Sequence, residues 1–182
     1  MSKKSIYSYK VSTSTKYEKK YDKANLQNKG INYNTTMEVS VDYSSGYAVA
    51  TAIDKKTVKV YKLKDDYNKT FSNSNKINEF KIAHPSSIQG GDLCGKYYYY
   101  LYGGYNSDGS KKTYIYCYDI TTGKLAWKTE IPLGNRIRKL LNTDYKNVEP
   151  EGIKVYYYKG SYKIFVGFKV NNYRSAIFYF DR

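Results

Sequence analysis

The sequence has little of the side-chain chemistry on which most enzyme sites depend. Its single histidine, His84, stands directly before Pro85, and no obvious serine or cysteine nucleophile accompanies it. One histidine and two cysteines, Cys94 and Cys117, give no zinc-ligand spacing. No glycine motif for dinucleotides or phosphates occurs. These absences favour a binding protein over an enzyme, and we predict no cofactor, with calcium as the one exception left open.

Long apolar runs are also missing. The N-terminal stretch MSKKSIYSYKV has lysines but no apolar segment behind them, so we expect no classical signal peptide. No segment reaches transmembrane length. The two cysteines do not distinguish a disulfide from two free thiols, so the redox compartment stays open.

Tyrosine and lysine dominate what is present. There are 25 tyrosines among 182 residues, and the formal net charge is +15. The only arginines are Arg136, Arg138, Arg174 and Arg182, so lysine supplies nearly all the positive charge. Such a surface attracts polyanions: nucleic acid, anionic lipid or the phosphate-rich polymers of a bacterial wall. Lysine favours loose attraction over base-specific reading. A general compositional bias is an alternative explanation of the charge.

Three segments repeat one plan of strand, turn, strand, turn and strand. They begin at Met37, Ile88 and Pro150, and Gly, Asn and Asp occupy the expected hairpin turns. A fourth strand follows twice, at 125–131 and at 76–83. The repeats span about 37–83, 87–131 and 150–182.

Four antiparallel strands in successive repeats predict an all-β, β-propeller-like fold in one domain, 1–182. Residues 1–36 hold one N-terminal strand, SIYSYKVS, and a polar segment. Because the last repeat shows only three strands, we expect that strand or a partner chain to close the ring, which allows a homo-oligomer. A sandwich of about ten strands and an eight-stranded ligand-holding barrel are the alternatives.

The stretch KYYYYLYGG, 96–104, lacks the polar alternation of a half-exposed strand. A middle strand covered on both faces by neighbouring blades would lack this alternation. Tyrosine fills such space while its hydroxyl reaches water or a carbonyl. We therefore predict that this strand lies between two sheets.

Alignment of the repeats places Glu38, Gln89 and Glu151 at the start of each first strand. In a propeller this strand lines the central channel, so the three side chains are expected to converge. They would bind a hard cation such as calcium, or a sugar. Capping of the channel around water is the alternative without a ligand. Glu38 and Glu151 also leave a glycosidase-type carboxylate pair open.

Aromatic side chains near the blade tips are candidates for stacking on sugar rings. We assign this role to Tyr105, Trp127, Tyr145 and Tyr173. Core packing is expected to use most of the other rings.

The third repeat, NVEPEGIKVYYYKGSYKIFVGFKVNNYRSAIFYF, resembles the C-terminal region of helveticin J-type class III bacteriocins of lactic-acid bacteria. The second, SSIQGGDLCGKYYYYLYGG followed by YDITTGKLAWKTEI, fits the same pattern. The resemblance covers roughly residues 37–182 and implies a propeller-like, secreted or cell-surface protein that binds or kills related bacteria.

Together these observations predict a non-enzymatic, bacteriocin-like protein that binds the anionic glycan or teichoic acid of Gram-positive envelopes. The first alternative is a propeller-type polysaccharide hydrolase or lyase. The second is a basic nucleic-acid-binding protein, which the absence of an open sheet of stacking aromatics in the pattern disfavours.

Overall fold

A computed structural model describes residues 6–11, 16–21, 37–52, 56–65, 67–83, 88–103, 112–131, 148–170 and 174–181. The first sheet contains β3 (Met37–Asp42), β4 (Tyr47–Ala52), β5 (Thr57–Lys62) and β6 (Lys76–Lys81). The second sheet contains β7 (Ile88–Cys94), β8 (Tyr97–Tyr102), β9 (Thr113–Asp119) and β10 (Lys124–Ile131). The third sheet contains β11 (Val148–Tyr158), β12 (Ser161–Val170) and β13 (Arg174–Asp181). The remaining elements are β1 (Ile6–Val11), β2 (Lys16–Tyr21), the short helix α2 (Tyr67–Thr70) and a 3-10 turn (Asn73–Asn75).

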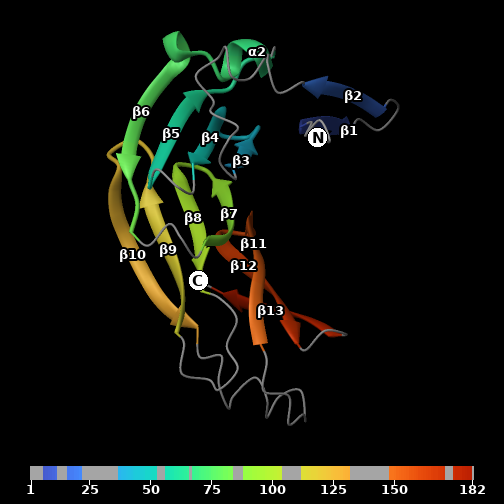
Figure 1. The fold of residues 1–182 in the computed structure, drawn as a ribbon, viewed down its shortest axis with the longest axis vertical. Coiled ribbons are helices and arrows are strands. Elements are labelled where there is room, and N and C mark those ends of the chain that lie inside the picture. The colour runs from blue at the N-terminus through green and yellow to red at the C-terminus, as the bar shows by residue number, and fades with distance from the viewer. Residues whose placement is uncertain are drawn as a thin grey trace, which may run out of the picture.

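Each of the three sheets is an antiparallel meander in which strands adjacent in sequence are hydrogen-bonded neighbours. The first strands lie next to one another, because β7 contacts β3 and also β11. Figure 1 shows the sheets following one another around an arc, with β3, β7 and β11 on its inner side and β6 and β10 on its outer side. The predicted all-β, propeller-like architecture is confirmed. No helix within the described ranges is long and apolar enough to cross a membrane.

The third sheet is shorter by one strand than the other two. Among the described residues β13 pairs only with β12. The predicted N-terminal strand is present as β1, but it pairs with β2 and does not complete the third sheet. Closure by a partner chain stays a prediction.

Hairpin turns fall where the glycine-containing segments predict them. Gly46 ends the turn between β3 and β4 with φ of 71°, and Gly160 lies between β11 and β12 with φ of 83°. Both values lie in the left-handed region that glycine adopts without a steric penalty. These turns keep successive strands adjacent, which produces the meander.

The tyrosine-rich strand β8 is covered on both faces, as predicted. Tyr98 and Tyr100 pack in a cluster with valines of the first sheet, whereas Tyr99 and Leu101 pack in a cluster with the third sheet. All four side chains are buried. The Tyr100 hydroxyl donates to the Ala83 carbonyl at 2.5 Å, so a buried ring keeps a partner for its polar group. The missing polar alternation of this strand follows from its place between two sheets.

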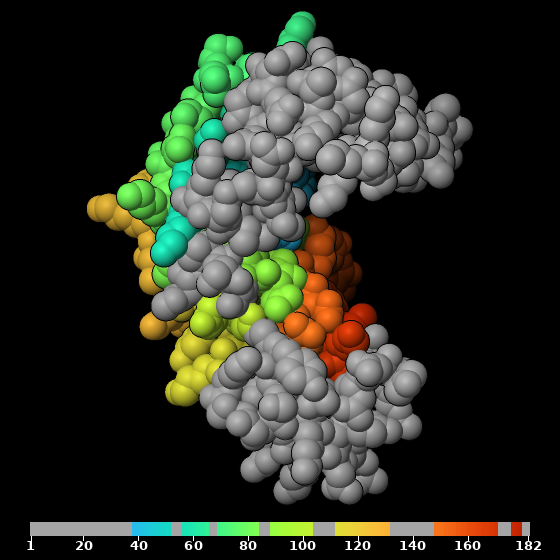
Figure 2. Space-filling model, in the orientation of Figure 1, coloured from blue at the N-terminus to red at the C-terminus, as the bar shows by residue number. Residues whose placement is uncertain are grey.

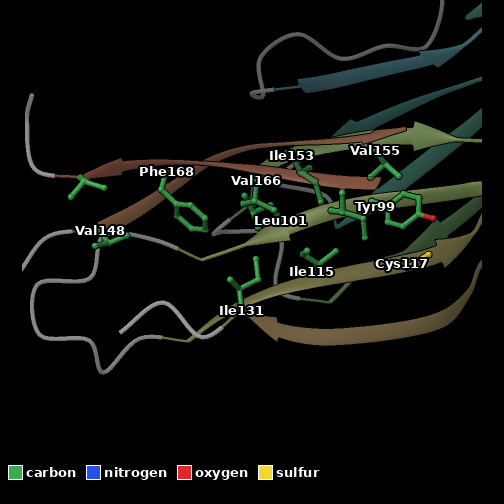
Figure 3. Packing of buried hydrophobic residues seen from close by; sticks show 12 residues of the cluster. Tyr99, Leu101, Ile115, Cys117, Ile131, Val148, Ile153, Val155, Val166 and Phe168 are labelled. Atoms are coloured by element: carbon green, nitrogen blue, oxygen red, sulfur yellow. The ribbon is translucent and has the colours of Figure 1, made fainter. Parts of the chain in front are cut away.

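The second and third sheets share the larger of the buried clusters. Figure 3 shows Ile153, Val155 and Val166 of the third sheet pointing toward Tyr99 and Leu101 of the second. Because strand side chains alternate, every second residue of β11, β12 and β13 points away from this core. In Figure 2 the third sheet, orange to red, follows the second at the end of the arc. The third sheet therefore has a second side that faces away from the core.

Candidate functional site

The three residues predicted to line the channel lie on the three first strands, but no hydrogen bond joins them to one another. Glu38 is half-buried, and its carboxylate accepts the backbone N–H of Gly91. The Gln89 amide donates to the Gly103 carbonyl at 3.3 Å and to the Glu149 carboxylate at 3.5 Å. Glu151 is exposed. Their ligand-binding role stays a prediction.

The sequence alignment of these residues misses a difference in register. Gln89 and Glu151 both sit at irregularities in pairing, between Ile88 and Gly90 and between Pro150 and Gly152. Glu38 instead pairs regularly with Thr51. A bulge adds one residue to a strand and moves the later side chains of that strand to the opposite face. Glu38 is therefore not the structural counterpart of the other two.

Side chains of β3 hydrogen-bond to the backbone of β7 at every second residue. The acceptors Glu38, Ser40 and Asp42 receive the N–H groups of Gly91, Leu93 (2.9 Å) and Gly95 (2.7 Å), respectively. The spacing of two on both strands follows from the alternation of strand side chains. These bonds satisfy N–H groups on the inner edge of β7 and, at Gly95, in the turn that follows it. We call them the seam.

The seam continues from β7 to β11. Asp92 accepts the Val155 N–H at 2.7 Å, and the Cys94 sulfur accepts the Tyr157 N–H. Asp92 also accepts the Ser40 hydroxyl at 3.2 Å and the Lys154 ammonium at 2.8 Å. Its 4% exposure is compatible with charge because every one of these partners is a donor. Asp92 was not singled out from the sequence, although an acidic residue between Gly91 and Leu93 on an inner strand is a usable signal.

Burial governs the ionisation of Glu38. It raises the pKa of this carboxyl above its usual value, the nearby Asp92 charge adds to the rise, and the Gly91 N–H opposes it. The Tyr98 hydroxyl beside Glu38 accepts the Thr51 hydroxyl at 2.9 Å, and burial raises its pKa as well. Glu38 and Asp92 thus both accept hydrogen bonds from the backbone of a neighbouring inner strand.

The same positions on β11 carry different chemistry. Gly152, Lys154 and Tyr156 occupy on β11 the places that Gly90, Asp92 and Cys94 occupy on β7. No carboxylate stands there to receive the N–H groups of a further strand. The seam therefore does not continue beyond the third sheet by the same bonds.

The outer side of the third sheet carries large exposed side chains. We call it the outward face and define it as Lys154, Tyr156, Tyr158, Lys163, Phe165, Lys169, Ile177 and Tyr179. Ile177 is 75% exposed, Tyr156 53% and Tyr179 52%. The tyrosine run 156–158 thus has the opposite environment from the run in β8, because no sheet in the described ranges covers it.

The rings on the outward face form two stacked pairs. Tyr156 and Tyr158 have centroids 5.8 Å apart and planes 18° apart, and Phe165 and Tyr179 have centroids 5.6 Å apart and planes 29° apart. Lysines flank both pairs. The Lys159 ammonium lies 5.1 Å from the Tyr158 centroid, and that of Lys163 lies 5.6 Å from the Tyr179 centroid. This arrangement combines flat apolar surfaces with positive charge.

Of the predicted stacking residues, only Trp127 lies in the described part of the chain. It is half-buried, and its ring meets that of Tyr99 edge-on with centroids 5.8 Å apart. Tyr105, Tyr145 and Tyr173 lie outside the described residues, as does His84. Sugar stacking by all four aromatic residues stays a prediction.

Cys94 and Cys117 form no disulfide. Within the described ranges no three His, Cys, Asp or Glu side chains cluster so as to hold a metal ion. The described residues thus provide no cluster of ligands for the calcium ion that the sequence left open.

Neither a search with protein-family models nor a comparison with curated proteins finds a match to this sequence. Among solved structures, the tail fiber of Staphylococcus aureus phage P68 is similar, with a TM-score of 0.59 and 20% identity over 79% of this chain and 28% of that one. The Dos1 propeller matches with a TM-score of 0.47 and 16% identity over 81% of this chain and 33% of that one. The first similarity shows a shared fold, and this chain spans a third or less of the length of either structure.

Proposed function

We propose that this protein is a non-enzymatic binding protein that attaches to an anionic glycan of a bacterial envelope through the outward face. The observation that supports it best is the two aromatic stacks held in the open on a three-stranded sheet. Clusters of exposed apolar side chains of this kind mark interaction surfaces more often than isolated ones do.

Carbohydrate suits this surface because a sugar ring has an apolar face of C–H bonds and a rim of hydroxyls. The face packs on an aromatic ring, and the rim stays hydrated or bonds to neighbouring polar groups. Stacked pairs already hold their rings in fixed planes, so less side-chain entropy is lost when a ligand binds. Of the inner-strand carboxylates, Glu38 and Asp92 are engaged in the seam, which favours binding over hydrolysis by a pair that includes Glu38.

Charge supports an anionic polymer over a neutral one. The chain has a net charge of +15, and Lys159 and Lys169 are exposed on or beside the outward face. Lysine attracts phosphate without demanding a fixed geometry, which fits a repeating polymer such as teichoic acid. The helveticin-type resemblance adds antibacterial activity against related Gram-positive bacteria to the proposal. The fold shared with a phage tail fiber is compatible with attachment to a surface.

The test is a pull-down of the purified protein on Gram-positive cell walls, before and after removal of teichoic acids, at two salt concentrations. We expect binding that falls with teichoic acid removal and with salt. Binding that survives both treatments would assign the ligand to peptidoglycan sugars. The absence of binding to either wall preparation would contradict the proposal.

Two controls address the alternative functions. Release of reducing ends from the wall that is lost in Glu38→Gln or Glu151→Gln, with folding retained, would establish a hydrolase. Affinity for DNA or RNA that exceeds wall affinity at the same salt would establish a nucleic-acid-binding protein.

A further inference from the structure

The outer edge of β13 differs from the outer edges of the other sheets. In the first and second sheets a fourth strand, β6 or β10, pairs with the third strand of the meander. In the third sheet β13 occupies the third place, and among the described residues no strand pairs with its other edge. Within the described part of the chain, one row of backbone N–H and C=O groups on β13 therefore has no partner strand.

The two complete sheets protect their edges with charge. The charged residues are Lys76, Glu79 and Lys81 on β6 and Lys124, Lys128 and Glu130 on β10. The charged residues of β13, Arg174 and Asp181, are its first and last, and the described side chains between them, those of Ala176, Ile177, Phe178 and Tyr179, carry no charge. Charge on an edge strand opposes pairing with another chain, and β13 lacks this protection along its middle.

We propose that β13 pairs antiparallel with β13 of a second copy of this chain, around a two-fold axis. The third sheets of the two copies then form one continuous sheet. The occupant is a second copy because the edge is self-complementary: an isologous contact needs one surface that matches itself. An antiparallel pair of identical strands meets this condition.

The alternation of β13 supports this choice. An axis through Ile177 places Ala176 opposite Phe178 of the second copy, and both of these side chains pack against the apolar cluster of their own subunit. Ile177 and Tyr179 then lie on the opposite side, in the outward face. Around this axis the core face of one copy adjoins the core face of the other, with Ala176 opposite Phe178, and the two outward faces adjoin as well.

The dimer would place two outward faces side by side on one sheet. This consequence rests on the proposed glycan binding, whereas the pairing itself does not. Once a polymer has bound one outward face, its binding to the second face is intramolecular. The overall affinity therefore rises although the contacts at each face stay the same. A ligand too short to reach both faces gains nothing.

Analytical ultracentrifugation of the purified chain over a range of concentrations tests the pairing. We compare the wild type with Ile177→Lys, which places like charges on both sides of the axis. Ile77→Lys is the matched control, because Ile77 is an exposed isoleucine on the outer strand β6 of the first sheet. Circular dichroism and urea unfolding establish that both variants fold. Hydrogen exchange of residues 174–181 gives a second readout.

We expect a concentration-dependent dimer for the wild type and Ile77→Lys, a monomer for Ile177→Lys, and slower exchange in β13 as the wild type associates. A wild type that stays monomeric up to its solubility limit overturns the proposal, and so does a dimer unaffected by Ile177→Lys. Because Ile177 belongs to the outward face, binding by Ile177→Lys is measured with a long teichoic acid polymer and with a fragment too short to reach both faces. Loss of the second contact should weaken binding of the long polymer about 10-fold or more relative to binding of the fragment, and an equal change for both ligands overturns the avidity. A monomeric variant that binds polymer as well as the wild type overturns the avidity while leaving glycan binding intact.

Discussion

The Asp92 carboxylate on β7 accepts the Val155 N–H of β11 at 2.7 Å. The same carboxylate accepts the Ser40 hydroxyl of β3 at 3.2 Å. One buried side chain thus links the first strands of all three sheets. The arc of sheets depends on this contact as well as on the apolar clusters between the sheets.

Replacing Asp92 by alanine should destabilise the protein strongly. The change leaves the buried Val155 N–H without its acceptor and removes the partner of Lys154. We expect a loss of about 3 kcal/mol in the free energy of unfolding. Urea denaturation measures it, with Asp65→Ala as the control because Asp65 is exposed. Equal stabilities of the two variants would contradict the role of Asp92.

Gly91→Ala should be costly where Gly152→Ala is not. A Cβ at Gly91 would lie 2.3 Å from the Tyr98 hydroxyl oxygen and 3.0 Å from a Glu38 carboxylate oxygen, whereas one at Gly152 meets nothing within 4 Å. Tyr98 is fully buried and packs in the cluster with Val49, Val58 and Val60. We expect a loss of about 1–3 kcal/mol for Gly91→Ala. Thermal unfolding of both variants checks this. If Gly91→Ala has the stability of the wild type, then Tyr98 and Glu38 shift to accommodate the added methyl group at little cost.

Glu38→Gln should change how stability depends on pH. Because burial and Asp92 raise the pKa of Glu38 in the folded state, the folded protein binds this proton more tightly than the unfolded chain. Ionisation of Glu38 therefore lowers stability as pH rises above the unfolded value of 4.5. The variant lacks this effect, so its stability relative to the wild type should increase from acid to neutral pH. A difference that does not vary with pH would contradict the shift.

Asp119→Asn should show the opposite sign. Hydrogen bonds from Thr121, assisted by Lys96, lower the pKa of Asp119 to about 2. Its ionised form stabilises the fold above the ordinary value of 3.8, and this stabilisation is lost as pH falls toward 2. The variant should be less stable than the wild type near neutrality, with the gap closing below about pH 4. Urea midpoints across this range measure it, and a gap that persists at pH 2 would contradict the assignment.

The sequence predicts the repeats well because their signals are local. Turn glycines and strand alternation mark the hairpins, and the absence of alternation in KYYYYLYGG marks a strand covered twice. The register of Gln89 and Glu151 is not local, since a bulge leaves no clear mark in the residues themselves. Alignment of the repeats by sequence therefore pairs them with Glu38.

The outward face was not predicted for a related reason. Tyr156 and Tyr158 follow the same tyrosine-rich pattern as β8, and only the order of the sheets determines that one run is buried and the other exposed. Burial on a second face depends on whether another sheet follows. The pattern of a single strand contains no such information.

The most direct test of the central claim is the affinity of Tyr156→Ala/Tyr179→Ala for Gram-positive cell walls, compared with that of Tyr43→Ala. Tyr43 is an exposed tyrosine in the turn of the first sheet, far along the chain from the outward face. Removal of one ring from each stack should weaken binding about 10-fold or more, while Tyr43→Ala binds like the wild type. Equal binding by the double variant, with folding retained, would contradict the claim that the outward face holds the glycan.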